Sequence, residues 1–220
     1  VWVATYAPNV VVVPADSPYN TIQDLIEAMR ANPGQITIGT AGIGSGGHFG
    51  AEVLKQVAGA DYKHITYAGG GPAFTAILSG EVDVCTQLLA ENKDAIISGD
   101  LKALCTLADE PITIAEGVTI PSIKEAYPEA EPWLPMGEVT GILIPKGLDE
   151  AKLQKIDHAF DVAINDQEFI DFCALRSFDI TPYGRDESQA YLEDFASRVC
   201  WMLYDAGAAP ISPDEFGIER

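Results

Sequence analysis

Residues 36–50 read ITIGTAGIGSGGHFG, and this stretch decides the fold class of the 220-residue chain. Gln35–Thr40 has the short apolar pattern of a strand, and Ala41–Gly47 is a glycine-rich loop. The apolar face of the following helix starts at Phe49 and continues through Val53 and Val57. A strand, a loop and a helix in this order predict one βα unit.

The same unit recurs on both sides of this stretch. Upstream, Val10–Val13 reads as a buried strand and Thr21–Asp24 as a capping box that begins a helix. The further elements that we expect are strands at 63–67, 82–86 and 101–107 and helices at 72–78 and 90–97. Alternating strands and helices predict an α/β fold with mostly parallel sheets flanked by helices.

The pattern changes after about residue 108. Prolines interrupt the segment up to Pro135, which we expect to be surface loops with one short helix near Ser122–Tyr127. The tail is predicted to hold a strand at 141–144 and three helices at 149–164, 167–175 and 187–206. We therefore predict an α/β lobe at 15–131, with 1–14 and 132–220 forming a second unit and the hinge.

Composition excludes some classes of function. The chain has 13 Lys and Arg against 33 Asp and Glu, a net charge of −20, so nucleic acid and anionic lipid are not expected partners. No apolar run approaches the roughly 20 residues that span a bilayer, so we expect no direct membrane insertion. The sequence begins at Val1 without Met, which we interpret as a processed chain or fragment whose signal peptide is not present.

The four cysteines allow two interpretations. They are too few for a disulfide scaffold and none forms a Cys-x-x-Cys pair, so four buried thiols are one expectation. A disulfide between Cys85 and Cys105 is the other, since both lie in predicted strands that could be neighbours.

The first glycine loop is a candidate anion site. Gly42–Gly47 matches G-x-G-x-x-G between a strand and a helix, but the acid that a dinucleotide site needs at the end of the next strand is replaced by Thr66-Tyr67. Free backbone N–H groups at a helix start, with Ser45 as hydroxyl donor or cap, suit a carboxylate as well as a phosphate. The alternative is a tight turn that needs glycine only for positive φ.

A second glycine loop, Tyr67–Pro72, also joins a strand end to a helix start. Two such loops at the carboxyl ends of adjacent parallel strands should line one crevice, where open α/β sheets bind ligands. His48 is either a packing imidazole or a hydrogen-bond donor to a bound anion, and Gln87 is either a surface amide or a polar group at the same edge.

Catalytic groups are scarce. We find no Gly-x-Ser-x-Gly elbow, no His-Glu-x-x-His and no metal-ligand spacing, and no base is paired with a cysteine. His64 and His158 lie inside a predicted strand and helix, which favours structural roles. We expect no enzyme activity, no metal and no cofactor.

The ordered motifs resemble a known family. Val10–Pro18, Asn32–Gly42, Gly80–Val84, Gly141–Gly147 and Asp205–Gly207 together, in this order and spacing, resemble the extracytoplasmic solute receptors of tripartite tricarboxylate transporters, the Bug or TctC family. The resemblance covers nearly the whole chain. It implies a type II periplasmic-binding-protein fold of two lobes, with the first lobe incomplete, because nothing here matches that lobe's own upstream glycine loop.

The resemblance also implies a function. It predicts a periplasmic receptor that holds a small carboxylate (a di- or tricarboxylate or an amino acid) between two lobes and delivers it to a membrane permease. The ligand-binding residues carried over by position are Thr40, Ala41, Gly42, Gly44, Ser45, Gly46, Gly47, His48, Tyr67, Gly69, Gly70, Gly71, Pro72 and Gln87. Gln87 stands where the family usually has an acid, and Val139-Thr140 where it has Trp-Phe, so the ligand is left open.

Two other functions remain open from the sequence. A nucleotide-dependent enzyme of the doubly wound class would use the Gly42–Gly47 loop for its cofactor. A sensory module would keep the receptor fold and signal to a partner other than a permease.

Overall fold

The computed structural model describes all residues, Val1–Arg220. The helices are α1 (Ile22–Ala31), α2 (Gly46–Ala58), α3 (Gly70–Leu78), α4 (Leu89–Ser98), α5 (Ile123–Ala126), α6 (Glu150–Ile164), α7 (Gln167–Arg176) and α8 (Arg185–Asp205), with 3-10 turns at Pro128–Trp133 and Pro213–Phe216. The strands are β1 (Trp2–Pro14), β2 (Thr37–Thr40), β3 (Lys63–Thr66), β4 (Val84–Leu88), β5 (Leu101–Thr106), β6 (Ile112–Ala115), β7 (Val118–Ile120), β8 (Gly137–Ile142) and β9 (Asp179–Ile180).

The α/β class is confirmed, with helices flanking the sheet, but the main sheet is mixed and not mostly parallel. Its strand order is β3-β2-β4-β1-β5, and β2 is parallel to both β3 and β4. β1 enters between β4 and β5 and is antiparallel to each of them. The helical crossovers do give β2 to β5 one common direction, as the βα pattern predicts, but the inserted β1 separates the last two.

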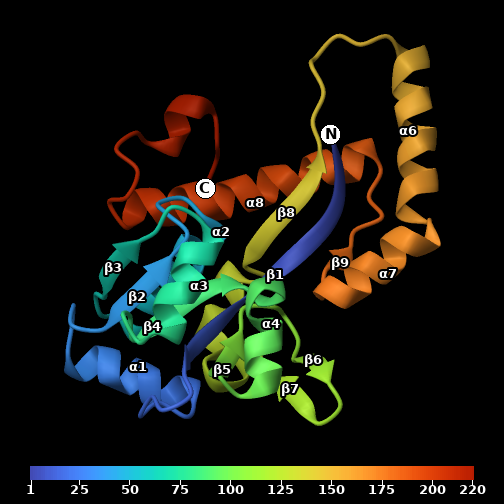
Figure 1. Ribbon diagram of the computed structural model, residues 1–220. Coiled ribbons are helices and arrows are strands. Elements are labelled where there is room, and N and C mark those ends of the chain that lie inside the picture. The colour runs from blue at the N-terminus through green and yellow to red at the C-terminus, as the bar shows by residue number, and fades with distance from the viewer.

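β1 is a long strand that takes part in two sets of pairings (Figure 1). Asn9–Pro14 lies in the sheet with β4 and β5, whereas Trp2–Pro8 pairs with β8 and briefly with β9. α8 runs along the back of the molecule, and α6 stands apart, reached from β8 by an extended segment. The division into lobes at 15–131 remains a prediction.

The valine run of β1 is buried on both faces. Val11 and Val13 belong to the core under α1, α2 and α8, while Val10 and Val12 belong to the core under α3 and α4. All four are completely buried, and burial of one such side chain contributes about 1.5–3 kcal/mol. A strand between two helical layers explains why this run does not alternate with polar residues.

Local signals place the starts of α1 and α2, and the structure shows the groups involved. Thr21 caps α1 through a reciprocal capping box with Asp24, and Ser45 caps α2 by accepting a hydrogen bond from the His48 N–H at 3.2 Å. α2 ends at Gly59, whose φ of 63° is left-handed. The Ser45 cap fixes where the first glycine loop ends and α2 begins.

Other expectations are corrected by the structure. The proline-rich segment contains a hairpin of β6 and β7, and the tail strand is Gly137–Ile142, not 141–144. All four cysteines are free. Cys85 pairs in register with Val12 and Cys105 with Val11, so β1 lies between the two thiols and they are not on neighbouring strands. Cys200 is only half-buried, unlike the other three.

No helix of this structure combines the length and the apolar character needed to cross a membrane.

Candidate ligand-binding site

The first glycine loop follows β2 and leads directly into α2. The Ser45 hydroxyl donates to the Gly42 carbonyl at 2.8 Å and accepts from His48, so it is fully engaged in shaping the loop. Gly42 and Gly44 have φ values of 134° and 78°, which side chains rarely adopt. A Cβ at Gly47 would collide with the Thr86 carbonyl oxygen on β4. These glycines are therefore needed for the turn and for the close approach of α2 to the sheet.

The His48 ring lies inside the protein, which favours the packing interpretation of this residue. Its Nδ1 accepts a hydrogen bond from the Gly44 N–H at 3.1 Å, and its Nε2 lies 3.6 Å from Glu52 Oε1. The ring stacks on His64, whose Nε2 is 2.7 Å from Thr40 Oγ1. Burial lowers the pKa of both imidazoles, which favours their neutral forms, and the His48 ring supports the loop from its interior side.

The second glycine loop adjoins the first, as the parallel pairing of β2 and β3 requires. The Gly69 N–H donates to the Ala41 carbonyl at 3.2 Å, and the Tyr67 N–H donates to the Thr40 carbonyl at 2.9 Å. α3 has no side-chain cap, so its first-turn N–H groups lack an acceptor from the cap residue. Gly71 has open space around it. The two helix starts thus meet at one edge of the sheet.

Not every predicted residue turns toward this edge. The Tyr67 hydroxyl donates to Glu81 at 2.9 Å, and burial together with that contact raises the pKa of the phenol to about 12. Gln87, by contrast, is buried at the second loop: a Cβ on Gly70 would lie 2.6 Å from its Nε2. The structure brings both loops and Gln87 together, and directs the His48 ring and Tyr67 hydroxyl elsewhere.

Two acidic residues at this edge were missed by the sequence analysis. Glu138, on β8, lies against the start of α2, since a Cβ on Gly46 would lie 2.7 Å from its Cγ and 3.1 Å from its Oε1. Glu91, in the first turn of α4, accepts a hydrogen bond from Gln87 Nε2 and lies against Gly70. One sequence feature could have pointed to Glu138: it directly precedes Val139-Thr140, the two positions that depart from the family pattern.

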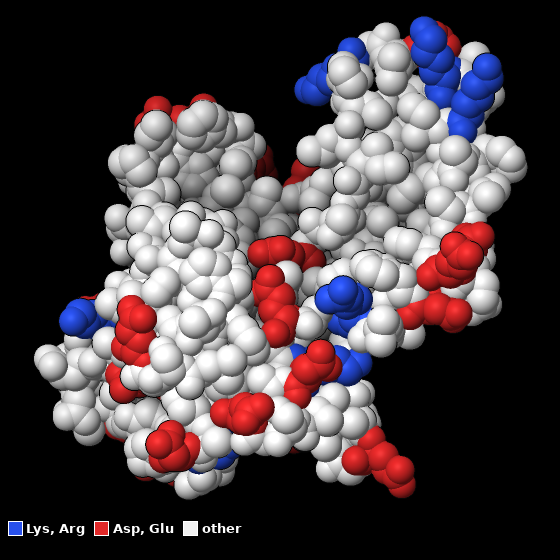
Figure 2. Space-filling view, viewed as in Figure 1, with Lys and Arg blue, Asp and Glu red and all other residues white.

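The position of Glu138 beside Gly46 and near Glu91 affects the pKa of its carboxyl group. Partial burial raises the pKa of the Glu138 carboxyl, the Gly46 N–H lowers it, and the Glu91 charge raises it. Figure 2 shows Asp and Glu side chains in the hollow between the two masses of the molecule. Glu138 and Glu91 bring two carboxylates to the starts of α2 and α3.

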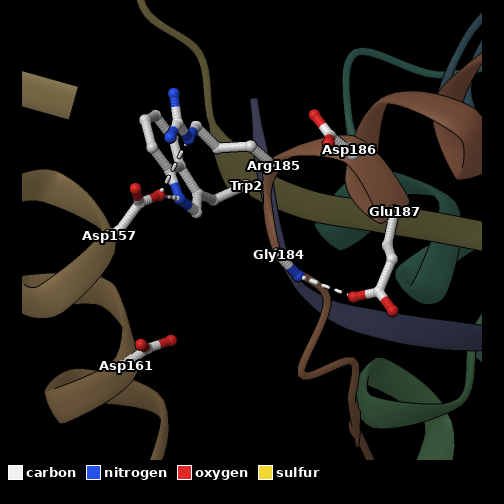
Figure 3. Close-up of a pocket in the computed structure, with 7 residues that line it drawn as sticks. All are labelled: Trp2, Asp157, Asp161, Gly184, Arg185, Asp186 and Glu187. Atoms are coloured by element: carbon white, nitrogen blue, oxygen red, sulfur yellow. Dashed lines mark hydrogen bonds and ion pairs between the residues drawn. The ribbon is translucent and has the colours of Figure 1, made fainter. Parts of the chain in front are cut away.

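A separate concavity of about 450 Å³ lies between α6 and the start of α8 (Figure 3). In it, the Trp2 indole N–H donates to Asp157 at 2.9 Å, and Arg185 pairs with Asp157 at 3.1 Å and with Glu150 at 2.9 Å. The Gly184 N–H donates to Glu187 at 3.0 Å. These contacts join β1, α6 and α8, and the concavity contains none of the predicted site residues.

Groups for covalent or metal chemistry are not assembled. No cluster of three or more His, Cys, Asp or Glu side chains is arranged to hold a metal ion. Burial raises the pKa of the Cys85 thiol to about 12 and that of Cys105 further, so neither thiol supplies a thiolate near neutral pH.

Comparison with known protein families gives a match over most of this chain. Residues 1–199 match the family described as tripartite tricarboxylate transporter family receptor. A UPF0065 protein of Bordetella pertussis is 26% identical over 206 residues, which cover 93% of this chain and 62% of the relative. The chain spans only 52% and 54% of two further relatives, from Pseudomonas sp. and Cupriavidus necator.

Two solved structures share the fold. An R. palustris protein with adipate superposes with a TM-score of 0.79 at 19% identity, covering 96% of this chain and 69% of that one. MatC from Rhodopseudomonas palustris with bound malate has a TM-score of 0.74 at 19% identity, covering 89% and 67%. At this identity the likeness establishes a common fold and leaves the ligand of this chain open.

Proposed function

Because the chain belongs to the family of tripartite tricarboxylate transporter receptors, we propose that it acts as a periplasmic solute-binding receptor, which encloses a small carboxylate between two lobes and delivers it to a membrane permease. The family is one of receptors and not of enzymes. Structural neighbours that hold adipate and malate support a carboxylate as the ligand class.

The observation that carries the proposal is the meeting of two helix starts at one sheet edge. The Gly69 N–H bonds to the Ala41 carbonyl, so the loops before α2 and α3 are held side by side. First-turn N–H groups carry partial positive charge and have no acceptors within their own helices. Enclosure of a carboxylate against them would lower the local dielectric constant and strengthen these contacts.

The lobe arrangement is part of the proposal. We place the second lobe at 15–131 and the remainder, 1–14 with 132–220, in the first. Two features support a hinge between them: β1 continues from one set of pairings to the other, and β8 pairs only with the first half of β1. A ligand at the glycine loops then faces β8 and the first lobe.

The binding residues that we propose have two kinds of role. Backbone donors come from the loops and first helical turns, and Gln87 adds a buried amide. Thr40, Ser45, His48 and Tyr67 shape the loops, because their side chains contact protein groups. The proposed set is Thr40, Ala41, Gly42, Gly44, Ser45, Gly46, Gly47, His48, Tyr67, Gly69, Gly70, Gly71, Pro72 and Gln87.

A thermal-shift panel tests the proposal. Mono-, di- and tricarboxylates, amino acids and NAD are added separately to the protein. A ligand at 100 times its dissociation constant stabilises the folded state by about 2.7 kcal/mol, which gives a measurable shift. A shift with a carboxylate and none with NAD is expected, whereas a shift with NAD alone would return the Gly42–Gly47 loop to nucleotide binding.

A matched pair of variants locates the site. Gly71→Leu places a side chain in open space at the second position of α3 and should abolish the carboxylate shift without unfolding the protein. Ala151→Leu makes the same kind of change at the exposed second position of α6 and should leave the shift intact. Equal carboxylate shifts in both variants would place the site away from α3.

A further inference from the structure

The first glycine loop is held from its interior side by the His48 ring. The Gly44 N–H donates to His48 Nδ1 at 3.1 Å, and the ring itself is buried. Because Nδ1 accepts this hydrogen bond, the neutral ring carries its proton on Nε2. The position of Gly44 in the loop therefore depends on an imidazole nitrogen that must stay unprotonated.

Glu52 offers the ring a second partner, one turn further along α2. Its Oε1 lies 3.6 Å from His48 Nε2 and accepts a hydrogen bond from the Tyr62 hydroxyl at 2.7 Å. Its Oε2 is buried and has no hydrogen-bond partner. Lys55, the next cation along the helix, is paired with Asp61 at 2.9 Å. A buried carboxyl oxygen without a donor is unfavourable, so a proton donor that approaches Glu52 stabilises it.

The other groups around the ring do not supply that donor. His64, from β3, stacks on His48, and its Nε2 is engaged with Thr40 Oγ1 at 2.7 Å. A positive charge on His48 lowers the pKa of His64, so the two rings are not charged together easily. The remaining side chains at this start of α2 come from β1, β4 and β8, and of these only the last titrates: Asn9, Thr86 and Glu138.

We propose that Glu52 is a positioning residue, which draws the His48 ring away from Gly44 once that ring takes up a proton, and that ligand binding is weakened as a result. The inference rests on the proposed function and adds a regulation of that same site. The added proton goes to Nδ1, which turns the acceptor of the Gly44 bond into a donor, so that two N–H groups face each other. The cationic ring then bonds to Glu52, and the Gly44 amide turns away.

Gly44 has room to make this change, and the ligand donors follow it directly. Its φ is 78°, and no atom lies within 4 Å of the place of a Cβ. The Ser45 cap and the first turn of α2, whose N–H groups are the proposed ligand donors, come next in the chain. Movement of Gly44 therefore displaces these donors. Burial lowers the pKa of the His48 imidazole, so the change should occur below its ordinary value of about 6.5.

Isothermal titration calorimetry at about pH 7.5 and about pH 5 tests the inference, with malate, adipate, citrate and glutamate as probes. His48→Ala should weaken binding at both pH values. His48→Asn should restore part of that affinity, since the amide Oδ1 can accept the Gly44 N–H and takes up no proton. Between the two pH values the wild type should lose about threefold or more affinity beyond any loss in His48→Asn, which reports the titration of the probe itself.

The role of Glu52 has its own variant and controls. Glu52→Gln should reduce the loss of affinity at the lower pH, because the cationic ring no longer has a charged partner. Glu27→Gln and His158→Asn, at exposed positions of α1 and α6, should behave as the wild type. Far-UV circular dichroism checks that each protein is folded at both pH values.

Each outcome supports or overturns the inference. Binding whose pH dependence is the same in the wild type and in His48→Asn overturns it and leaves the receptor proposal intact. A loss of affinity in Glu52→Gln as large as that in the wild type also overturns it. Binding of no probe at the higher pH overturns the receptor proposal, and the inference with it.

Discussion

The imidazole rings of His48 and His64 stack in the interior with centroids 4.4 Å apart and planes 14° from parallel. His48 comes from the start of α2 and His64 from β3, so the stack joins the two elements that carry the glycine loops. Around it, the Tyr62 hydroxyl donates to Glu52 at 2.7 Å. The stack makes the geometry of the site sensitive to protonation.

Acidification should therefore destabilise the protein through these rings. Burial lowers the pKa of both histidines in the folded state, so the unfolded chain takes up protons first as the pH falls below about 6.5. The stability from the neutral rings is complete above that pH and is lost as the pH falls through the lowered folded values. Urea unfolding at a series of pH values should show this loss.

Variants assign the effect to the stack. His64→Gln removes one partly buried imidazole of the stack and should flatten the pH dependence of the unfolding free energy between about pH 7 and 5. His158→Gln, at an exposed position of α6, should leave the dependence as in the wild type. An unchanged slope in His64→Gln would remove the stack from this explanation.

Gly47 should be intolerant of any side chain. Its Cα faces the Thr86 backbone, and a Cβ would collide with that carbonyl oxygen, which cannot move without breaking β4 from its neighbours. Gly47→Ala should lower the free energy of unfolding by about 1–3 kcal/mol, the usual cost of overpacking. Gly71→Ala, in open space, is the control in the same urea titration and should stay near the wild-type value.

Lys93 links α4 to the end of α7. Its Nζ donates to the Leu175 carbonyl and to Ser177 Oγ, both at 3.1 Å, where the helix end carries partial negative charge. Lys93→Met should cost about 0.3–1 kcal/mol of stability. Since we propose that α4 and α7 lie in different lobes, it should also weaken ligand binding by favouring an open arrangement. Lys63→Met, an exposed change on β3, should affect neither, as calorimetry can check.

The sequence predicted helix caps and loop positions correctly, because the residues that determine them lie within a few positions of one another. Thr21 and Ser45 are caps because the groups that they bond follow three positions later, and the two loops adjoin because each ends a strand in a repeated βα unit. The insertion of β1 between β4 and β5 depends on pairing between distant segments. The Val10–Val13 run shows burial on both faces but not the direction of its neighbours.

Glu138 and Glu91 could not be found from the sequence for the same reason: their positions depend on contacts between distant segments. Glu138 reaches Gly46 only because β8 lies beside β1 and β1 lies beside α2, a chain of contacts that no local pattern contains. In the sequence, Glu138 and Glu91 are two of 33 acidic residues. Likewise, the interior position of the His48 ring follows from its stacking on His64, and the sequence left this open between packing and ligand contact.

The thiols should show two classes of reactivity, because three are shielded by the core and one is not. Burial raises the pKa of all four thiols, but Cys85, Cys105 and Cys173 are at most 1% exposed, whereas Cys200 is half-buried on α8 and can be reached by a reagent. A thiol-specific reagent at about pH 8 should therefore modify one thiol in the native protein and the remaining three only after unfolding. Cys200→Ser should remove the native reaction and leave the other thiols unchanged. Fewer than four titratable thiols in the unfolded, unreduced protein would indicate a disulfide, which the position of β1 between Cys85 and Cys105 argues against for that pair.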